Sequence, residues 1–335
     1  MPEHEYVGNI HIHTRYSDGS GDVNLVRRAG RRAGLDFLIV TDHQTLAGRT
    51  HQGWQDGLLL LVGEELGTHA GHCLGLGLDQ ASLETEPRAM IAAATRQGGL
   101  GIIAHPHDLR YSWPDWECTG FDGLSLWNYT SQWLGKMQAP LTKLLYLVIP
   151  GLAITSPPGE TLAQWDALHR RGLAVPGLGA SDAHAFGWRP CGVPLVILPY
   201  RLLLRAINTH VLLTQPLTGR LPEDERLILA ALRRGACFVA NDARGCARGF
   251  RFLAQAGEES WTMGETAPYK SGLSVKAAAP RPGWIVLRCD GAEIFSAYGR
   301  SLDLHDPEPG VYRVEVYRDK KRRWGWIFSN PIWVH

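Results

Sequence analysis

The chain has 335 residues and a formal net charge of +1, and these two values set the first limits on its function. A near-neutral chain has no overall field that would attract nucleic acid or an anionic membrane. The length exceeds one average domain, so the chain can bury a core of roughly two hundred residues and still form a smaller second unit.

Cysteine usage and apolar runs indicate the compartment. Six cysteines are scattered without a Cys-x-x-Cys pair or a regular spacing, which predicts reduced thiols. Residues 1–5 lack the basic start and apolar core of a signal peptide. The most apolar run, residues 144–154, is 11 residues long and too short to span a bilayer. We therefore expect a soluble cytoplasmic enzyme without a membrane partner.

The first predicted strand carries two histidines on one face. Over residues 7–13 two isoleucines alternate with His11 and His13, so an extended strand would point both imidazoles the same way. Asp18 and Gly19 mark a turn that could return a carboxylate to the end of this strand. Paired imidazoles can hold a metal ion, but His-x-His is also common on surface strands, so partners elsewhere must decide.

Four later apolar runs each end at side chains that could bind a metal. They are residues 35–40 before Asp42 and His43, 58–62 before Glu64 and Glu65 with His72 further on, 100–104 before His105, and 173–180 before Asp182 and His184. Short, continuously apolar runs are typical of strands buried on both faces of a parallel sheet. The carboxyl ends of such strands open on one face, so we expect these side chains to converge.

Helices are predicted between the strands, and their alternation is typical of a βα barrel or a doubly wound sheet. Apolar spacing predicts helices over residues 21–32, 87–94, 159–172, 201–208 and 222–234. Asp22 and Gly34 would cap the first helix, and Pro87 would start the second. Loops are expected at 44–57 and 108–120, another strand at 121–128, and more sheet or a closing flap at 191–198.

The pattern changes near residue 246. Short alternating runs follow, separated by Gly, Pro and Asp turns, at residues 273–277, 284–289, 311–317, 326–327 and 332–334. This pattern predicts a small β-sandwich of immunoglobulin-like type. We therefore place one domain at residues 1–245 and a second at 246–335. The basic run 318–323 could be a nucleic-acid patch, but we interpret it as a hairpin tip solvated by its own charges.

The motifs together resemble those of the PHP (polymerase and histidinol phosphatase) family, in the same order along the chain. The resemblance covers about residues 6–185 and rests on His11, His13, Asp18, the Thr41-Asp42-His43 tripeptide, Glu65, His72, His105 and the Asp182-x-His184 pair. Its Gly-x-Glu, Gly-His and Ala-His-Pro motifs are most similar to those of the family branch that includes carbaryl hydrolase. The resemblance implies an α/β fold, a distorted (β/α)7 TIM-like barrel followed here by the small sandwich.

Imidazole and carboxylate ligands without thiolate suit zinc, manganese or iron. The resemblance implies two or three such ions, divided as His11, His13, Glu65 and Asp182 for the first, Glu65, His72 and His105 for the second, and Asp18, His43 and His184 for the third. A carboxylate bridge holds two cations about 3.5 to 4 Å apart, so a water shared between them loses a proton near neutral pH. The resulting metal-bridging hydroxide would be the nucleophile.

Several assignments stay open at this stage. Glu64 could replace Glu65, and Asp42 could orient a histidine through its second ring nitrogen. The loop before His72 makes that ligand the least secure of the nine. Besides Asp182 and His184, His107 is a candidate catalytic group, and His51 and His69 also lie near the motifs. Three arginines close to the motifs are candidate clamps for an anionic substrate, namely Arg15, Arg110 and Arg189.

Three functions of different classes are compatible with the sequence. The first is a metal-dependent phosphoesterase that hydrolyses a small phosphorylated metabolite or nucleotide, with no other nucleic acid as partner. The second is a metal-dependent hydrolase of an ester, amide or carbamate, whose apolar pocket would use Trp113, Trp116, Trp127 and Trp133. The third is a non-enzymatic metal-folded module that serves a partner through its sandwich. Three metals and the arginines near the motifs favour the first, a phosphoric ester hydrolase, and the complete ligand set argues against the third.

Overall fold

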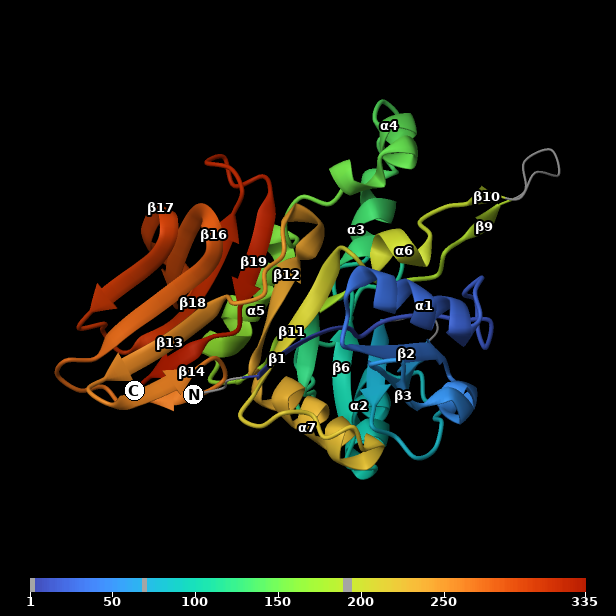
Figure 1. Cartoon of the computed structure of the whole chain (residues 1–335), viewed down its shortest axis with the longest axis horizontal. Coiled ribbons are helices and arrows are strands. Elements are labelled where there is room, and N and C mark those ends of the chain that lie inside the picture. Colours follow the sequence, from blue (N-terminus) through green and yellow to red (C-terminus); the bar gives the residue numbers. More distant parts are fainter. Residues whose placement is uncertain (1–3, 68–70, 189–194) are drawn as a thin grey trace.

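A computed structural model describes residues 4–67, 71–188 and 195–335 and shows a mixed α/β fold with one large sheet. Figure 1 shows helices packed around the amino-terminal strands, and a region of strands that contains residues 251–334 beside them. The amino-terminal strands are β1 (His4–Asn9), β2 (Phe37–His43), β3 (Gly53–Gln55), β4 (Leu58–Leu66), β5 (His72–Leu76), β6 (Leu100–Ala104), β7 (Gly123–Asn128) and β8 (Gly177–Ala180).

The order of these strands brings distant motifs together. β1, β2 and β4 pair in parallel, and so do β6, β7 and β8. β5 differs from the prediction of a purely parallel sheet, because it runs antiparallel to both β4 and β6. Beyond β1, Ile12 forms a parallel bridge with Ala183, so the chain after β8 lies beside the chain after β1. The ends of the first and last motif strands are therefore neighbours.

Four of the five predicted helices form, and two more that were not predicted lie between residues 129 and 148. The helices are α1 (Val23–Ala33), α2 (Pro87–Arg96), α3 (Tyr129–Lys136), α4 (Lys143–Val148), α5 (Gly159–Arg170), α6 (Tyr200–Leu203) and α7 (Leu221–Arg234), with short 3-10 turns at Ala47–His51, Pro150–Leu152 and Asp242–Arg244. Asp22 accepts a hydrogen bond from the Leu25 amide, and Gly34 ends α1 with a φ of 76°. α2 packs on β5 and β6, and α7 packs on β11 (Ile207–Leu213). We find no helix among the described residues with the length and hydropathy of a membrane span.

Two of the predicted elements are wrong. The helix expected over residues 201–208 is limited to the single turn α6, and β11 begins at Ile207. β11 lies between β1 and β12 (Cys237–Asn241) and is buried along its whole length, so sheet pairing decides its conformation. The expected loop at 44–57 contains a 3-10 turn and β3, which pairs with β4. Of the sheet or flap expected at 191–198, residues 191–194 lie outside the described residues, and β10 (Leu195–Val196) pairs with β9 (Gly187–Trp188) in a separate small sheet.

The carboxyl-terminal strands continue the large sheet. They are β13 (Arg251–Ala256), β14 (Glu259–Thr262), β15 (Thr266–Ala267), β16 (Ser274–Cys289), β17 (Ala292–His305), β18 (Gly310–Tyr317), β19 (Gly325–Ser329) and β20 (Ile332–Val334). Two predicted strands fall on β16, which is irregular between Ala278 and Gly283. β17 escaped prediction because most of its side chains are exposed and its polarity does not alternate. These strands have an apolar core that includes Phe250, Phe252 and Trp326.

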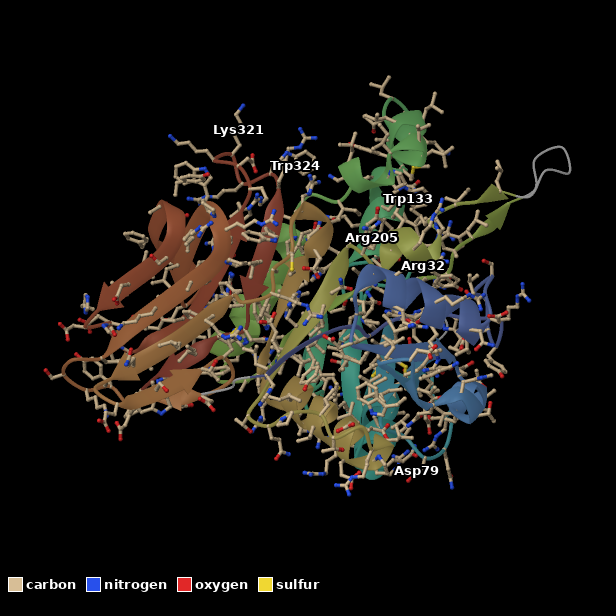
Figure 2. All side chains as sticks on the ribbon, in the orientation of Figure 1. Arg32, Asp79, Trp133, Arg205, Lys321 and Trp324 are labelled. Carbon is tan, nitrogen blue, oxygen red and sulfur yellow. The ribbon has the colours of Figure 1, made fainter. Side chains whose placement is uncertain are left out.

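The basic run 318–323 is the connection between β18 and β19, as the hairpin interpretation predicts. Figure 2 shows Lys321 at the outer end of this hairpin, with Trp324 nearer the body of the protein. Arg323 and Arg244 both lie over the Trp324 ring, and Arg322 pairs with Glu293. The positive charges are therefore distributed among aromatic rings and a carboxylate instead of forming one bare cluster.

Two sets of contacts join the carboxyl-terminal strands to the rest. β12 pairs antiparallel with β19, which makes the sheet continuous between the two regions. The buried Arg313 of β18 donates two hydrogen bonds of 2.8 Å to Asp166 of α5. Burial opposes the charge of Arg313, but Asp166 and Glu315 outweigh that effect and raise its pKa. This joint places α5 and the chain before it against the carboxyl-terminal strands.

We predict that Asp166→Ala lowers the free energy of unfolding by about 3 kcal/mol, because it leaves a buried guanidinium with poorer compensation. Glu315 would remain beside Arg313, but Arg288 shares that carboxylate. Urea denaturation followed by tryptophan fluorescence measures the change. The control is Arg31→Ala, which breaks an exposed pair with Asp56 and should cost less than about 1 kcal/mol. Equal losses in the two variants would contradict a stabilising role for the buried pair.

Candidate metal centre

All nine side chains that the resemblance assigns as ligands lie in one cluster at the strand ends. Their ligand-type atoms form three groups, and within each group these atoms lie within 4.8 Å of one another. The groups are His11, His13, Glu65 and Asp182; Glu65, His72 and His105; and His13, Asp18, His43 and His184. The last group differs from the expected allocation in that it also includes His13.

The first group is buried and has the dimensions of a tetrahedral site. His11 Nε2 and His13 Nε2 are 3.0 Å apart, and Glu65 Oε2 lies 3.0 Å from each. Asp182 Oδ1 lies 3.4 Å from His11 Nε2 and 3.3 Å from His13 Nε2. Ligands of a tetrahedral ion with bonds of about 2.0–2.1 Å are separated by about 3.3 Å. The four side chains therefore fit a transition metal in both atom type and spacing.

Glu65 faces two groups with different oxygens. Oε2 is directed to His11 and His13, whereas Oε1 lies 2.9 Å from His72 Nδ1 and 3.0 Å from His105 Nε2. A carboxylate in this position can bridge two cations, one through each oxygen. The location of Glu65 at the buried end of β4 makes it the centre of the cluster.

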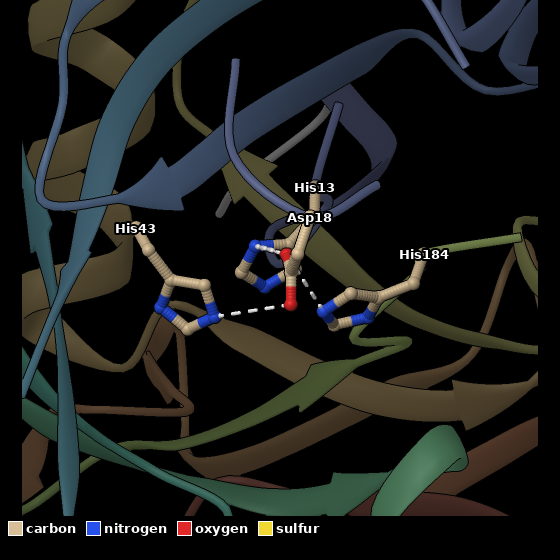
Figure 3. A group of neighbouring side chains, drawn as sticks. All are labelled: His13, Asp18, His43 and His184. Carbon is tan, nitrogen blue, oxygen red and sulfur yellow. Dashed lines mark ion pairs between the residues drawn. The ribbon is translucent and has the colours of Figure 1, made fainter. Parts of the chain in front are cut away.

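The third group is the most exposed part of the cluster, and Figure 3 shows its four side chains directed toward one another. Asp18 Oδ1 lies 3.2 Å from His184 Nε2 and 3.6 Å from His13 Nδ1, while Oδ2 lies 3.7 Å from His43 Nε2. The Asp18 side chain is 56% exposed. His13 thus presents Nε2 to the buried group and Nδ1 to this outer group.

Electrostatics explains why the cluster fits cations. Burial by itself would raise the pKa of Glu65. The imidazoles of His11, His105 and His13 have the larger, opposite effect and hold this pKa well below its usual value. Burial opposes the charge of His13 and His105, yet hydrogen bonds to buried carboxylates raise their pKa to about 10 and about 9. The carboxylates therefore require positive charge beside them, which protons or divalent cations can supply. Since the two compete, metal affinity should rise with pH.

Two cluster residues have strained backbones. His105 has a φ of 27° and Asp182 has a φ of 52°, values that residues other than glycine seldom adopt. Thr130 Oγ1 donates to the backbone oxygen of Asp182 at 2.7 Å, and Tyr200 Oη donates to that of His13 at 2.7 Å. These contacts hold the ligand-bearing backbone in place. Sequence reasoning missed Thr130 and Tyr200, because neither belongs to a motif.

The two alternatives left open by the sequence lie outside the cluster. Glu64 Oε1 accepts a hydrogen bond from the Ser82 amide, and burial raises the pKa of Glu64 to about 7. Among the described residues, Asp42 has no hydrogen bond to a histidine. It accepts hydrogen bonds from the amide and hydroxyl of Thr14 and from the Ser17 hydroxyl, so it supports the turn that carries Asp18.

The other candidate residues are dispersed. His107 lies beside a cavity, with Nδ1 3.1 Å from Thr161 Oγ1, and its ring stacks on Trp116. Arg15 is exposed and donates to the Ser20 backbone oxygen of its own loop. Arg110 is also exposed. His51 contacts the Tyr16 hydroxyl, and the expected sites at His69 and Arg189 lie outside the described residues.

A cavity of about 440 Å³ reaches the cluster at His105. Its wall is formed by the segment after β6, by the end of β7 and α3, and by residues 155–161. Ser156 in this wall lies within hydrogen-bond distance of the Arg323 backbone oxygen and the Gly325 amide. The carboxyl-terminal strands therefore support one side of the cavity.

We predict that Glu65→Gln reduces metal binding more than Glu64→Gln does. Loss of a residue that only hydrogen-bonds to a metal ligand lowers metal affinity roughly 10–100-fold. Loss of the bridging carboxylate should lower metal affinity by at least this factor. Glu64→Gln is a matched control, because it makes the same change one residue away and keeps an acceptor for Ser82. Isothermal titration with Zn²⁺ and Mn²⁺, together with elemental analysis, measures both variants. Equal affinities would remove Glu65 from the ligand set.

No family model and no curated protein matches the sequence. Among solved structures, a two-domain protein of Bacteroides vulgatus containing a predicted PHP-like metal-dependent phosphoesterase is 15% identical, with a TM-score of 0.47 over 98% of this chain and 95% of that one. A candidate metal-dependent phosphoesterase of Bifidobacterium adolescentis is 17% identical (TM-score 0.36), and an amidohydrolase of Chromobacterium violaceum with bound sulfate and no metal is 16% identical (TM-score 0.33). Each of these last two matches covers 53% of this chain and 87% of the chain of the solved structure. TM-scores below 0.5 do not define the activity of this chain.

Proposed function

We propose that the chain is a metal-dependent hydrolase of the PHP kind, acting as a phosphoesterase on a small phosphorylated metabolite or nucleotide. The observation that carries the proposal is the position of Glu65, whose two oxygens face two separate groups of imidazoles. A third group around Asp18 adjoins them. Such a set suits two or three zinc, manganese or iron ions. Residues 1–245 would form the distorted (β/α)7 barrel and residues 246–335 the sandwich.

Divalent cations held by these side chains would supply Lewis acidity, which would activate water at neutral pH and offset the negative charge that develops on a phosphoryl group. The protein's own part is to hold the charged side chains of the cluster in fixed positions. Asp182 and Glu65 provide buried negative charge, and His11 and His13 are kept in register by their shared strand end. The backbone of Asp182 is strained, and the hydrogen bond from the Thr130 hydroxyl to its backbone oxygen holds it in that conformation. The carboxylate is therefore in place before the substrate arrives.

His107 is the group that we propose to protonate the leaving oxygen. It lines the cavity two residues after His105, so a substrate that reaches the cluster through the cavity passes its ring. Thr161 holds Nδ1, which leaves Nε2 for the substrate. His184 and Asp182 belong to the metal cluster itself, and their role is to position charge and water there.

The cavity gives less support to an ester, amide or carbamate substrate. That alternative requires an aromatic pocket, but Trp113, Trp127 and Trp133 are buried and use their indole N–H groups within the protein. Trp116 lies against His107, and none of the four tryptophans belongs to the residues that line the cavity at His105. We therefore retain the phosphoesterase as the proposed function.

We expect His11→Ala and Asp182→Ala to lower phosphate release at least a thousandfold while the fold is retained. The Lewis acidity of the metal lowers the activation free energy by several kcal/mol, and each 1.4 kcal/mol of activation free energy changes the rate about tenfold. A parallel screen of phosphate esters and aryl esters, with metal-loaded and chelator-treated protein, measures the effect, and circular dichroism monitors the fold. Full activity after metal removal, or cleavage of aryl esters alone, would refute the assignment.

The role of His107 has a separate test. His107→Gln should lower kcat about 100-fold for an alkyl phosphate, the usual range of a general acid, but much less for p-nitrophenyl phosphate. The reason is that p-nitrophenolate leaves without a proton. His51→Gln is the matched control, since His51 also lies near a motif, its ring contacts the Tyr16 hydroxyl, and it does not line the cavity. Equal losses for both substrates would assign His107 to binding instead of protonation.

A further inference from the structure

The helix α4 and the turn before it turn an apolar stripe toward solvent. Side chains spaced as one helical stripe (i, i+3, i+4, i+7) are here all apolar and exposed, namely Leu141 (99%), Leu144 (72%), Leu145 (45%) and Val148 (71%). None of the six residues of α4 is buried. On the other side of the helix, Tyr146 and Leu147 pack against the core. Contiguous exposed apolar surface of this kind marks an interaction site.

The charges around this apolar stripe are positive. Lys136 and Lys143 are the only charged side chains in residues 123–159. The β18–β19 connection adds a basic hairpin, because five of the six residues 318–323 are lysine or arginine. In the described part of the chain only Arg322 of these five forms an ion pair, with Glu293. Three of the others contact tryptophan rings, which position their charge without neutralising it.

The basic hairpin is attached to the chain that follows the apolar stripe. The Arg244 guanidinium lies over the Trp324 ring at the end of the hairpin and donates to the Ile154 backbone oxygen at 3.0 Å. The Ser156 hydroxyl donates to the backbone of the hairpin at 3.2 Å. Figures 1 and 2 share one orientation and show α4 and Lys321 at the same edge of the molecule. The stripe and the hairpin therefore belong to one face.

We propose that the apolar stripe and the basic hairpin together dock the protein on an anionic lipid surface. Charge complementarity decides the occupant. Acidic headgroups match the basic side chains, and the stripe enters the boundary between headgroups and acyl chains, as interfacial helices do. A second copy docked through the same face would set basic side chains against basic side chains. The net charge of +1 is a sum over the chain and does not describe this local distribution.

Docking in this way also orients the cavity at His105. The chain that carries the apolar stripe leaves the cavity wall at Lys136 and returns to it at Thr155. A protein held by the stripe therefore keeps this wall close to the lipid surface. The stripe and the hairpin contain none of the nine clustered side chains, so docking is tested separately from the proposed hydrolase activity.

Vesicle binding by the full chain tests the proposal. Co-sedimentation compares vesicles of phosphatidylserine and phosphatidylcholine in equal parts with vesicles of phosphatidylcholine alone. We expect binding to the anionic vesicles to be at least about tenfold stronger, and to weaken with added sodium chloride, because salt screens exposed charges. Equal binding to both kinds of vesicle, or binding to neither, would overturn the proposal.

Leu144→Gln tests the apolar stripe. Because insertion buries this leucine, its loss should weaken vesicle binding about tenfold or more. Leu83→Gln is the matched control, since Leu83 is 77% exposed and belongs to the loop before α2, whose Asp79 lies at the opposite edge from Lys321 in Figure 2. Both leucines are exposed, so both variants should keep the circular dichroism spectrum of the wild type. Equal vesicle binding by the two variants would exclude the stripe from docking.

The double variant Lys320→Gln with Lys321→Gln tests the basic hairpin. Each basic side chain near an anionic surface strengthens binding about fivefold, so affinity for the anionic vesicles should fall about 25-fold. The control is Arg28→Gln with Arg32→Gln, which removes two exposed charges from α1 and changes the net charge equally. If both double variants lose the same affinity, net charge governs binding and the hairpin assignment is overturned.

Light scattering after size-exclusion chromatography distinguishes a second copy from a lipid surface. We expect a molecular mass that Leu144→Gln leaves unchanged. A dimer that Leu144→Gln dissociates, in a protein that does not bind vesicles, would make the apolar stripe a subunit interface and overturn the proposal. If the anionic vesicles are bound but no phosphate ester is hydrolysed, the proposed function fails and the docking surface stands.

Discussion

The buried carboxylate of Glu65 is the constraint on which the rest of the site depends. It lies at the end of β4 with five imidazoles within 3.5 Å of its two oxygens, and Asp182 adds a second buried carboxylate. Burial alone would favour the neutral acid, so these carboxylates remain charged only with compensating positive charge nearby. Protonated histidines can supply it, as the raised pKa of His13 and His105 shows. Divalent cations can replace those protons, which couples metal affinity to pH.

The fold places these charges by bringing strand ends together. β1 and β8 lie far apart in the sequence, yet the bridge between Ile12 and Ala183 holds His11 and Asp182 beside each other. The turn that carries Asp18 is in turn tied to β2 through Asp42. The precision of the cluster therefore comes from backbone pairing and from hydrogen bonds one layer behind the ligands.

The carboxyl-terminal strands contribute to the cavity rather than to the metal cluster. They are joined to the rest through β12 and β19 and through the buried Arg313–Asp166 pair. Ser156, which lines the cavity, contacts the end of the β18–β19 hairpin. The cavity wall is thus shared between two regions that the sequence pattern treats as separate domains. This arrangement gives the second region a physical role in shaping the cavity wall.

The sequence by itself predicted which nine side chains lie together in the cluster and the strands that carry them. The buried strands are short apolar runs, and polar side chains at their ends stand out because burial of charge is costly without a function. Helices with strong local signals were equally readable, as Asp22, Gly34 and Pro87 illustrate. Residues 207 and 208 were assigned to a helix and residues 209–213 to no element, and only the position of β11 between β1 and β12 decides its conformation.

Only the tertiary structure decided which of several neighbouring side chains belong to the cluster. It separated Glu65 from Glu64, assigned Asp42 to the Asp18 turn, and placed both nitrogens of His13 between two groups. It also showed that the apolar stripe at α4 faces solvent on the same face as the basic hairpin. The reason is physical. Residue type and spacing report local burial and chain direction, whereas the distance between side chains from separate strands depends on pairing and register across the whole sheet.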